Sequence, residues 1–220
     1  MKIIELRASV TASNDRDADA LRAEMRAAGV LLVNLMSAPG SGKTTLIARL
    51  IGDLPDLRLA VMEADIESAV DAERIAALGA QAVQVHTDGM CHMDAGMTAA
   101  AWHGMDAHGA DIAILENVGN LICPAEYDTG AGCRVMLLSV PEGDDKPLKY
   151  PLMFRQSDAL VITKTDALPF FRFDLEQCTA RARRLNPEIR IFPVSAKTGE
   201  GMAALEDWLR ARLADWRGGR

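Results

Sequence analysis

Long apolar runs, basic clusters and abundant cysteines are all missing from this sequence of 220 residues. No stretch approaches the ~20 consecutive apolar residues of a membrane-spanning helix, and the amino-terminal segment lacks the charged-then-apolar pattern of a secretion signal. We therefore expect a cytoplasmic protein with no membrane partner. Only four cysteines are present, and in that compartment they indicate free thiols or metal ligands rather than a disulfide framework.

The charge balance argues against a further class of partner. The chain has 24 Lys and Arg against 31 Asp and Glu, a net charge of -7, and no basic run. Since proteins that bind nucleic acid carry a basic surface, we expect no nucleic-acid partner. No repeat, low-complexity tract or Pro-rich linker divides the chain. We expect a single domain over residues 1–220, in which residues 1–29 form an N-terminal helical extension.

Short apolar segments alternate with amphipathic ones along most of the chain. Such alternation predicts an α/β fold with a mostly parallel central sheet and helices on both faces. A helix is expected over residues 15–28 after an N-cap at Asn14, and a final helix over 202–216 with one stripe of leucines, Leu205, Leu209 and Leu213. The expected strands are residues 30–36, 57–63, 82–86, 111–115, 134–140, 158–162 and 189–194.

Residues 37–44 carry a phosphate-binding pattern. They read Ser-Ala-Pro-Gly-Ser-Gly-Lys-Thr, which matches G-x-x-x-x-G-K-S/T except that Ser37 replaces the first glycine. An expected strand precedes them and an amphipathic stretch follows, so the P-loop context is present and favoured over an incidental Gly-rich turn. Lys43 would reach the outer phosphates and the Thr44 hydroxyl would bind Mg²⁺. The predicted nucleotide-binding residues here are Gly40, Ser41, Gly42, Lys43, Thr44 and Thr45, and the fold is that of a P-loop NTPase.

Two later segments indicate which nucleotide binds. Residues 163–166 (Thr-Lys-Thr-Asp) and 195–197 (Ser-Ala-Lys) each follow an expected strand and resemble the guanine-reading motifs of GTPases. The Asp166 carboxylate can accept from both the ring N–H and the exocyclic amine of guanine, a donor pair that adenine does not offer. Lys164 would pack on the base, and a second loop would close over it through Ser195, Ala196 and Lys197. We therefore predict a GTPase.

Three residues form a candidate metal site. Cys91 and His92 are neighbours in a loop after one expected strand, and Cys123 follows another strand at the same sheet edge. A thiolate, imidazole and thiolate set suits Ni²⁺ or Zn²⁺. Spacing alone leaves open a second interpretation, in which these cysteines are small buried side chains.

Longer strings make a resemblance specific. Residues 116–125 (Glu-Asn-Val-Gly-Asn-Leu-Ile-Cys-Pro-Ala), 91–95 and 139–151 resemble the nickel-insertion GTPase family of nickel-iron hydrogenase maturation. The resemblance runs from about residue 30 to the C-terminus. It implies a Mg²⁺-dependent GTPase that converts GTP to GDP and phosphate, and a homodimer promoted by nucleotide or metal. It further implies a nickel or zinc site of Cys91, His92 and Cys123 at the dimer interface, a second accessory protein as partner, and nickel delivery to the hydrogenase large subunit.

The same resemblance assigns roles at the nucleotide. Asp65 lies where the family has a switch aspartate, although Ala64 replaces a usual glycine. Asp65 and Glu116 are candidates, with Thr44, for positioning Mg²⁺ directly or through water, and with Lys43 for catalysis. Each acid taken alone could instead cap a strand end.

Other residues carry weaker signals. Asp71 and Arg74 resemble a charged helical segment of the family, or are simply solvated helix charges. Cys133 and Cys178 lack any ligand pattern around them, so we predict a structural role for both.

Two alternative functions remain open. One is the sister urease accessory GTPase for nickel delivery, which shares the P-loop but has a Cys-Pro-His metal motif. Here Cys123 is followed by Pro124 and Ala125, which disfavours that interpretation. The other is a metal-binding scaffold with little GTPase activity, against which the intact Lys43 and Asp166 argue.

Overall fold

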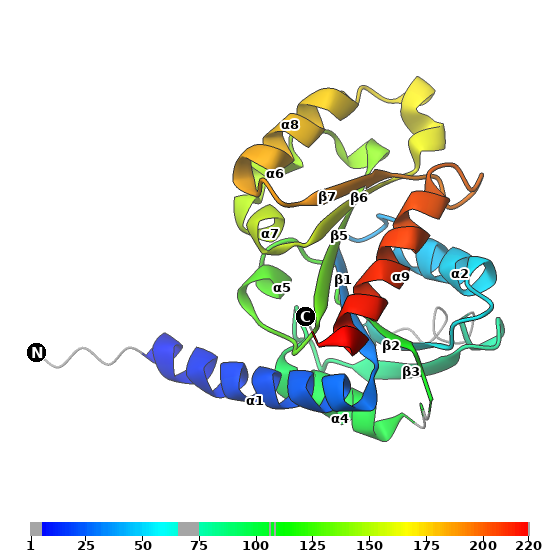
Figure 1. Cartoon of the computed structure of the whole chain (residues 1–220). Helices are drawn as coiled ribbons and strands as arrows, with labels where there is room; N and C mark the ends of the chain where they lie inside the picture. The colour runs from blue at the N-terminus through cyan, green and yellow to red at the C-terminus, as the bar shows by residue number, and fades with distance from the viewer. Residues whose placement is uncertain (1–5, 66–74, 106, 108, 220) are drawn as a thin grey trace, which may run out of the picture.

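Seven parallel strands form the centre of the molecule (Figure 1). The computed structural model describes residues 6–65, 75–105, 107 and 109–219, and within them every strand pairing is parallel. The order is β3-β2-β4-β1-β5-β6-β7. The bounds are β1 Leu31–Ser37, β2 Leu59–Asp65, β3 Gln81–His86, β4 Ile112–Glu116, β5 Cys133–Ser139, β6 Ala159–Thr163 and β7 Arg190–Pro193. No strand differs from its predicted bounds by more than two residues, and the predicted α/β fold is confirmed.

Helices cover both faces of this sheet (Figure 1). They are α1 Leu6–Ala28, α2 Lys43–Asp53, α4 Ala95–Gly104, α5 Cys123–Glu126, α6 Lys146–Lys149, α7 Pro151–Gln156, α8 Leu175–Leu185 and α9 Met202–Gly218, with 3-10 turns η1 Val140–Glu142 and η2 Thr165–Phe170. On β5, Val135 and Leu137 belong to one apolar cluster and Met136 and Leu138 to a second. Because neighbouring side chains of a strand point to opposite faces, α2 and α9 cover one face, and α7 and α8 cover the other.

The last helix, α9, supplies much of the first cluster. Its stripe of Leu205, Leu209 and Leu213 is buried against the sheet, together with Trp216. The predicted helix is therefore confirmed, and its leucine stripe belongs to the core.

The first helix differs from its prediction. It begins at Leu6 rather than at residue 15, so Asn14 lies inside it and is not an N-cap. Asn14 is 9% exposed, and its amide is bonded to backbone groups from two distant parts of the chain. The cap prediction was wrong because those tertiary partners, which no local pattern shows, satisfy the side chain in place of the helix's own N–H groups.

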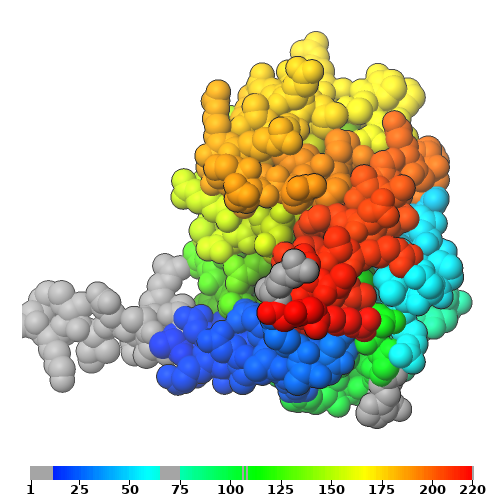
Figure 2. Space-filling model, in the orientation of Figure 1, coloured from blue at the N-terminus to red at the C-terminus, as the bar shows by residue number. Residues whose placement is uncertain are grey.

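Helix α1 is built into the body of the protein through its second half. Ala18, Leu21 and Met25 recur at helical spacing and are at most 2% exposed. Arg26 stacks over the Trp216 ring of α9, 4.1 Å from its centroid, where Figure 2 shows α1 running beside the end of α9. The role of residues 1–29 as an extension of a single domain stays a prediction.

The strand order also fixes where a ligand would bind. Strands β2, β3 and β4 lie on one side of β1 in the sheet, and β5, β6 and β7 lie on the other side. In open α/β sheets, ligands bind at the carboxyl ends of strands beside such a change of side. The predicted phosphate loop follows β1, Glu116 ends β4 and Thr163 ends β6, so these segments meet at one edge. Among the helices described, none has the length and apolar character needed to cross a bilayer.

Candidate nucleotide and metal sites

The loop between β1 and α2 has the shape of a phosphate-binding loop. Gly40 and Gly42 adopt φ angles of 73° and 97°, which glycine reaches without steric cost. Lys43 Nζ donates to Ser37 Oγ at 3.0 Å, and Ser41 Oγ donates to the same oxygen at 2.6 Å. Ser37, the one departure from the motif, therefore holds the lysine within the loop.

Carboxylates from two neighbouring strands lie beside this lysine. Thr44 Oγ1 donates to Glu116 Oε1 at 3.2 Å, and Lys43 Nζ lies 4.0 Å from that oxygen. Glu63 on β2 is the register partner of Glu116 on β4, and both side chains are buried. A cavity of about 500 Å³ opens here, lined by Pro39, Gly40, Gly42, Lys43, Thr44, Thr45, Glu63, Ala64, Glu116, Asn117, Val118, Gly119 and Lys164.

Glu63 was missed from the sequence, because a lone acid inside an apolar strand carries no motif. Its pairing with Glu116 becomes visible only once β2 and β4 are neighbours. Asp65 is the last residue of β2 and pairs with His86 of β3, and its magnesium role stays a prediction. Asp71 and Arg74 lie outside the described residues.

A second cavity, of about 260 Å³, continues from the first toward the predicted base-reading residues. It is lined by Gly42, Thr45, Thr163, Lys164, Asp166, Ala167, Ala196 and Lys197, of which Gly42, Thr45 and Lys164 also line the phosphate cavity. Ser195 Oγ donates to Asp166 Oδ1 at 2.7 Å, so the carboxylate is held in place by the second loop. The two segments that the sequence predicts to read guanine therefore lie side by side.

The residue at the start of this motif, Thr163, connects β6 to the phosphate loop. Its hydroxyl donates to the Ser41 carbonyl at 2.6 Å, and Lys164 Nζ donates to the Gly40 carbonyl at 2.7 Å. Both residues therefore hold the end of β6 against the phosphate loop.

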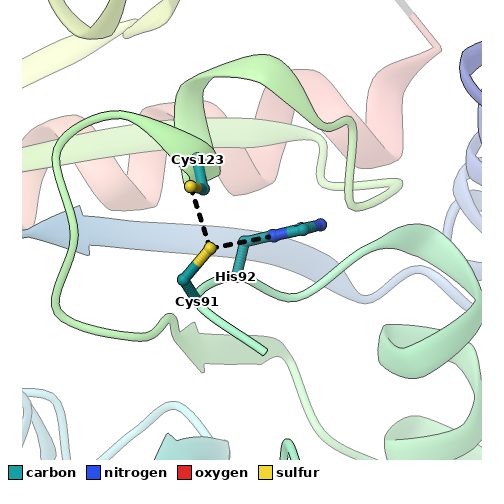
Figure 3. A group of neighbouring side chains, drawn as sticks. All are labelled: Cys91, His92 and Cys123. Carbon is teal, nitrogen blue, oxygen red and sulfur yellow. Dashed lines mark hydrogen bonds between the residues drawn. The ribbon is translucent and has the colours of Figure 1, made fainter. Parts of the chain in front are cut away.

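The three candidate metal ligands meet at the same edge of the sheet (Figure 3). Cys91 and His92 follow β3, and Cys123 begins α5. Their donor atoms lie within 4.8 Å of one another, and the two sulfur atoms are 2.9 Å apart. Donors on one ion lie roughly 3 to 4.6 Å apart, given metal bonds of about 2.0–2.3 Å, so this set fits a soft divalent ion. Cys91 is exposed, Cys123 is half-buried and His92 is buried.

Protonation of these ligands follows from their surroundings. Burial lowers the pKa of His92 below its ordinary value, against the opposing effect of two nearby carboxylates, so its imidazole is neutral and able to bind metal at neutral pH. The ring also stacks on Tyr127, with centroids 3.9 Å apart. The hydrogen bond with Cys91, followed by burial, raises the pKa of the Cys123 thiol. A metal ion bound through Cys123 would therefore displace a proton from this thiol.

The remaining cysteines agree with a structural role. Cys133 and Cys178 are at most 1% exposed. Burial raises the pKa of each thiol to about 12, which keeps both protonated and unreactive.

Asn117 links the nucleotide cavity to the metal ligands, and it too was missed from the sequence. It directly follows Glu116, and its Oδ1 accepts from the Met93 N–H at 3.1 Å, one residue after His92. Its Nδ2 donates to Asn34 Oδ1 of β1 at 3.0 Å. A buried amide therefore connects the loop that carries Cys91 and His92 to the end of β4 at Glu116.

The chain after Asn117 approaches the phosphate loop closely. A Cβ on Gly119 would lie 2.9 Å from Pro39 Cγ and 3.0 Å from Pro39 N. Only glycine fits this approach without a shift of the backbone. The segment that leads to Cys123 thus lies directly against the phosphate loop.

Comparisons with known proteins agree with this geometry. Residues 31–193 match the family model described as CobW/HypB/UreG, nucleotide-binding domain. Hydrogenase maturation factor HypB of Azotobacter chroococcum is 45% identical over 209 residues, covering 94% of this chain and 68% of the relative. The chain belongs to the HypB family of hydrogenase maturation factors. HypB of Escherichia coli K12 is 44% identical over 212 residues, covering 96% of this chain and 73% of the relative.

A solved structure agrees with the HypB assignment across the whole fold. The crystal structure of HypB from Helicobacter pylori in complex with nickel has a TM-score of 0.88 and 38% identity, covering 92% of this chain and 96% of that one. The resemblance stated from the sequence is therefore confirmed. The chain carries the nucleotide-binding domain of the HypB family.

Proposed function

We propose that this HypB-family protein is a GTP-hydrolysing metallochaperone. It binds Ni²⁺, or Zn²⁺ in its place, through Cys91, His92 and Cys123, and releases nickel for insertion into the hydrogenase large subunit with a second accessory protein. The observation that carries this proposal is the short path between its two sites. That path runs from Thr44 through Glu116 to Asn117, which holds the metal-binding loop.

The nucleotide site supports hydrolysis of GTP. Lys43 is held in the loop where it would neutralise charge on the β and γ phosphates. Thr44 and Glu116 offer the hydroxyl and carboxylate oxygens that Mg²⁺ prefers, and they are the residues that would hold it. The ion, when bound, supplies positive charge to the phosphates. Asp166 selects guanine, and Ser195 orients its carboxylate.

A dimer that shares the metal is the second part of the proposal. Three donors leave a coordination position open, and Cys91 faces solvent. Exposed apolar side chains flank the site, with Met90 43% and Ile122 58% exposed. A second copy placed here would cover these side chains and bring a second set of ligands. Analytical ultracentrifugation with and without Ni²⁺ and a non-hydrolysable GTP analogue tests this, since a monomer in all conditions would contradict it.

Replacing any one ligand should weaken metal binding. Cys91→Ala, His92→Ala and Cys123→Ala should each lower Ni²⁺ affinity by more than about tenfold, because even residues that only support ligands contribute that much. Isothermal titration on reduced protein measures the affinity. Cys133→Ala and Cys178→Ala are the matched controls and should keep the wild-type value. An equal loss in the control variants would assign the metal to other residues.

Nickel affinity should also fall as the pH is lowered. Because the pKa of the Cys123 thiol is raised, that thiol is protonated at neutral pH and its proton must leave when metal binds. Each thiol proton displaced makes the dissociation constant about tenfold weaker per pH unit of acidification. Titrations over a range of pH measure this slope, and a flat profile would exclude thiolate ligation by Cys123.

Nucleotide state should change nickel affinity. A γ-phosphate can hold a segment in one arrangement and release it on hydrolysis, and here that segment runs from Glu116 to Cys123. Couplings between sites are typically about five- to 150-fold in affinity. We expect a difference in that range between the GDP state and the state with a non-hydrolysable GTP analogue. Linkage requires that nickel shift the preference between the two nucleotides by the same factor.

Gly119→Ala should reduce this coupling, because the added Cβ forces the segment away from Pro39. Gly52→Ala is its matched control, since a Cβ there meets nothing within 4 Å. Equal nickel affinities in both nucleotide states of the wild type, with dimerisation controlled, would mean that the two sites are independent.

The proposed recipient of nickel, the hydrogenase large subunit, is tested in cells. A strain that lacks this protein should lose hydrogenase activity, and either the wild-type gene or added nickel should restore it, whereas the Cys123→Ala gene should not. Undiminished hydrogenase activity in the deletion strain would contradict the proposed client. Loss of urease activity instead would favour the urease alternative, and metal binding without GTP turnover would favour the scaffold.

A further inference from the structure

Asn14 in α1 joins the two stretches of chain that carry the metal ligands. Its Oδ1 accepts from the Ala95 N–H at 2.9 Å, and its Nδ2 donates to the Asp128 carbonyl at 2.9 Å. Ala95 is the first residue of α4, three positions after His92, and Asp128 follows α5, five positions after Cys123. One buried amide therefore spans the two segments that must meet around a metal ion.

The contact with α4 supplies a hydrogen-bond acceptor that the start of this helix lacks. The first N–H groups of a helix have no partner within it. In α4 the Asp94 side chain accepts from the Met97 N–H at 2.8 Å, and Asn14 Oδ1 accepts from the Ala95 N–H. Asn14 thus fixes the end of the turn that presents Cys91 and His92.

The contact with Asp128 fixes the other segment. Tyr127, the residue before it, stacks on the His92 ring. Arg22 of α1 also donates to Asp128 Oδ2 at 2.7 Å, so α1 holds this stretch at two points. Although burial acts in the opposite direction, the Gly130 N–H and the nearby arginines hold the pKa of Asp128 below its ordinary value, which keeps the carboxylate charged for that contact.

The amide is chemically suited to this double role. Asparagine offers a donor and an acceptor on one rigid group, and both partners are backbone atoms of segments far away in the sequence. Aspartate would keep the acceptor but lose the donor, and alanine would lose both. An asparagine inside a helix is otherwise unfavourable, so its position here is explained by the tertiary contacts.

We propose that Asn14 is a positioning residue of the metal site, through which α1 sets the spacing between Cys91–His92 and Cys123. The inference rests on the proposed metal function. It adds that the metal geometry depends on the amino-terminal helix, which precedes the nucleotide-binding domain in the sequence and carries no ligand itself.

The test compares Asn14→Ala and Asn14→Asp with Leu21→Ala. Leu21 is a buried residue of the same helix, so its replacement loosens α1 while leaving the Asn14 amide intact. The probes are Ni²⁺ affinity, the thiolate-to-metal absorption of the Co²⁺-loaded protein, GDP affinity and the thermal transition. Asn14→Ala should weaken Ni²⁺ binding by roughly tenfold and shift the absorption bands, with GDP affinity unchanged. Asn14→Asp, which keeps the contact to Ala95, should have a Ni²⁺ affinity between those of Asn14→Ala and the wild type.

Two outcomes overturn the inference. One is unchanged Ni²⁺ affinity and absorption in Asn14→Ala, and the other is an equal loss in Leu21→Ala at the same thermal transition. If Asn14→Ala does not fold, Asn14→Asp decides by the same readouts. Failure of the wild type to bind Ni²⁺ through Cys91, His92 and Cys123 would instead refute the proposed function.

Discussion

Lys43→Ala should lower GTP turnover by about a hundred- to a thousandfold, the range seen when a donor to developing negative charge is removed. Lys43 Nζ is fixed by Ser37 and lies 4.0 Å from Glu116, so its charge is already placed at the phosphate end of the cavity. Phosphate release at saturating GTP measures the effect. Because Lys43 belongs to neither apolar cluster, the thermal transition should stay near that of the wild type.

Lys149→Ala is the matched control for this experiment. Lys149 is exposed and forms a surface ion pair with Asp145 at 2.6 Å, so its loss should leave turnover unchanged. If Lys43→Ala hydrolyses GTP at the wild-type rate, the lysine is not the phosphate ligand. If its transition falls steeply, the lost activity reflects unfolding and the assignment to catalysis fails.

Asp166→Asn should change which nucleotide the protein binds. Guanine offers two donors to this carboxylate, and losing these charge-assisted bonds should cost about 3 kcal/mol, or more than a hundredfold in GTP affinity. The amide can donate to the C2 oxygen of xanthine, so XTP should become the preferred ligand. Ser195 would still hold the side chain, because its hydroxyl donates to Oδ1.

Titrations of GTP, ATP and XTP against both proteins measure this change. Asp56→Asn is the control, since Asp56 lies at the surface in an ion pair with Arg210. This variant should keep the nucleotide preference of the wild type. Equal affinity of the wild type for ATP and GTP would remove the basis for guanine selection.

The sheet and the phosphate loop could be predicted because their signals are local. Buried parallel strands appear as short apolar runs, and a P-loop places its glycines and lysine within eight consecutive residues. Even the departure at Ser37 was visible, although its acceptance of hydrogen bonds from Lys43 and Ser41 was not.

Asn14, Asn117 and Glu63 could not be predicted for the opposite reason. The partners of Asn14 lie at residues 95 and 128, those of Asn117 at residues 34 and 93, and that of Glu63 on β4. A single sequence shows only neighbours along the chain, and Asn14 accordingly looked like a helix cap. The candidate metal ligands lie between these extremes. Residue type and loop position make Cys91, His92 and Cys123 candidates, the family resemblance makes the set specific, and the fold brings their donor atoms together.

The short strand β7 has a consequence for how two copies of the protein can associate. It spans only Arg190–Pro193 at the edge of the sheet, with an exposed arginine at one end and proline, which has no N–H, at the other. Edge strands of this kind are poor templates for adding a strand from another molecule. Pairing of a strand from another molecule with this edge of the sheet is therefore disfavoured.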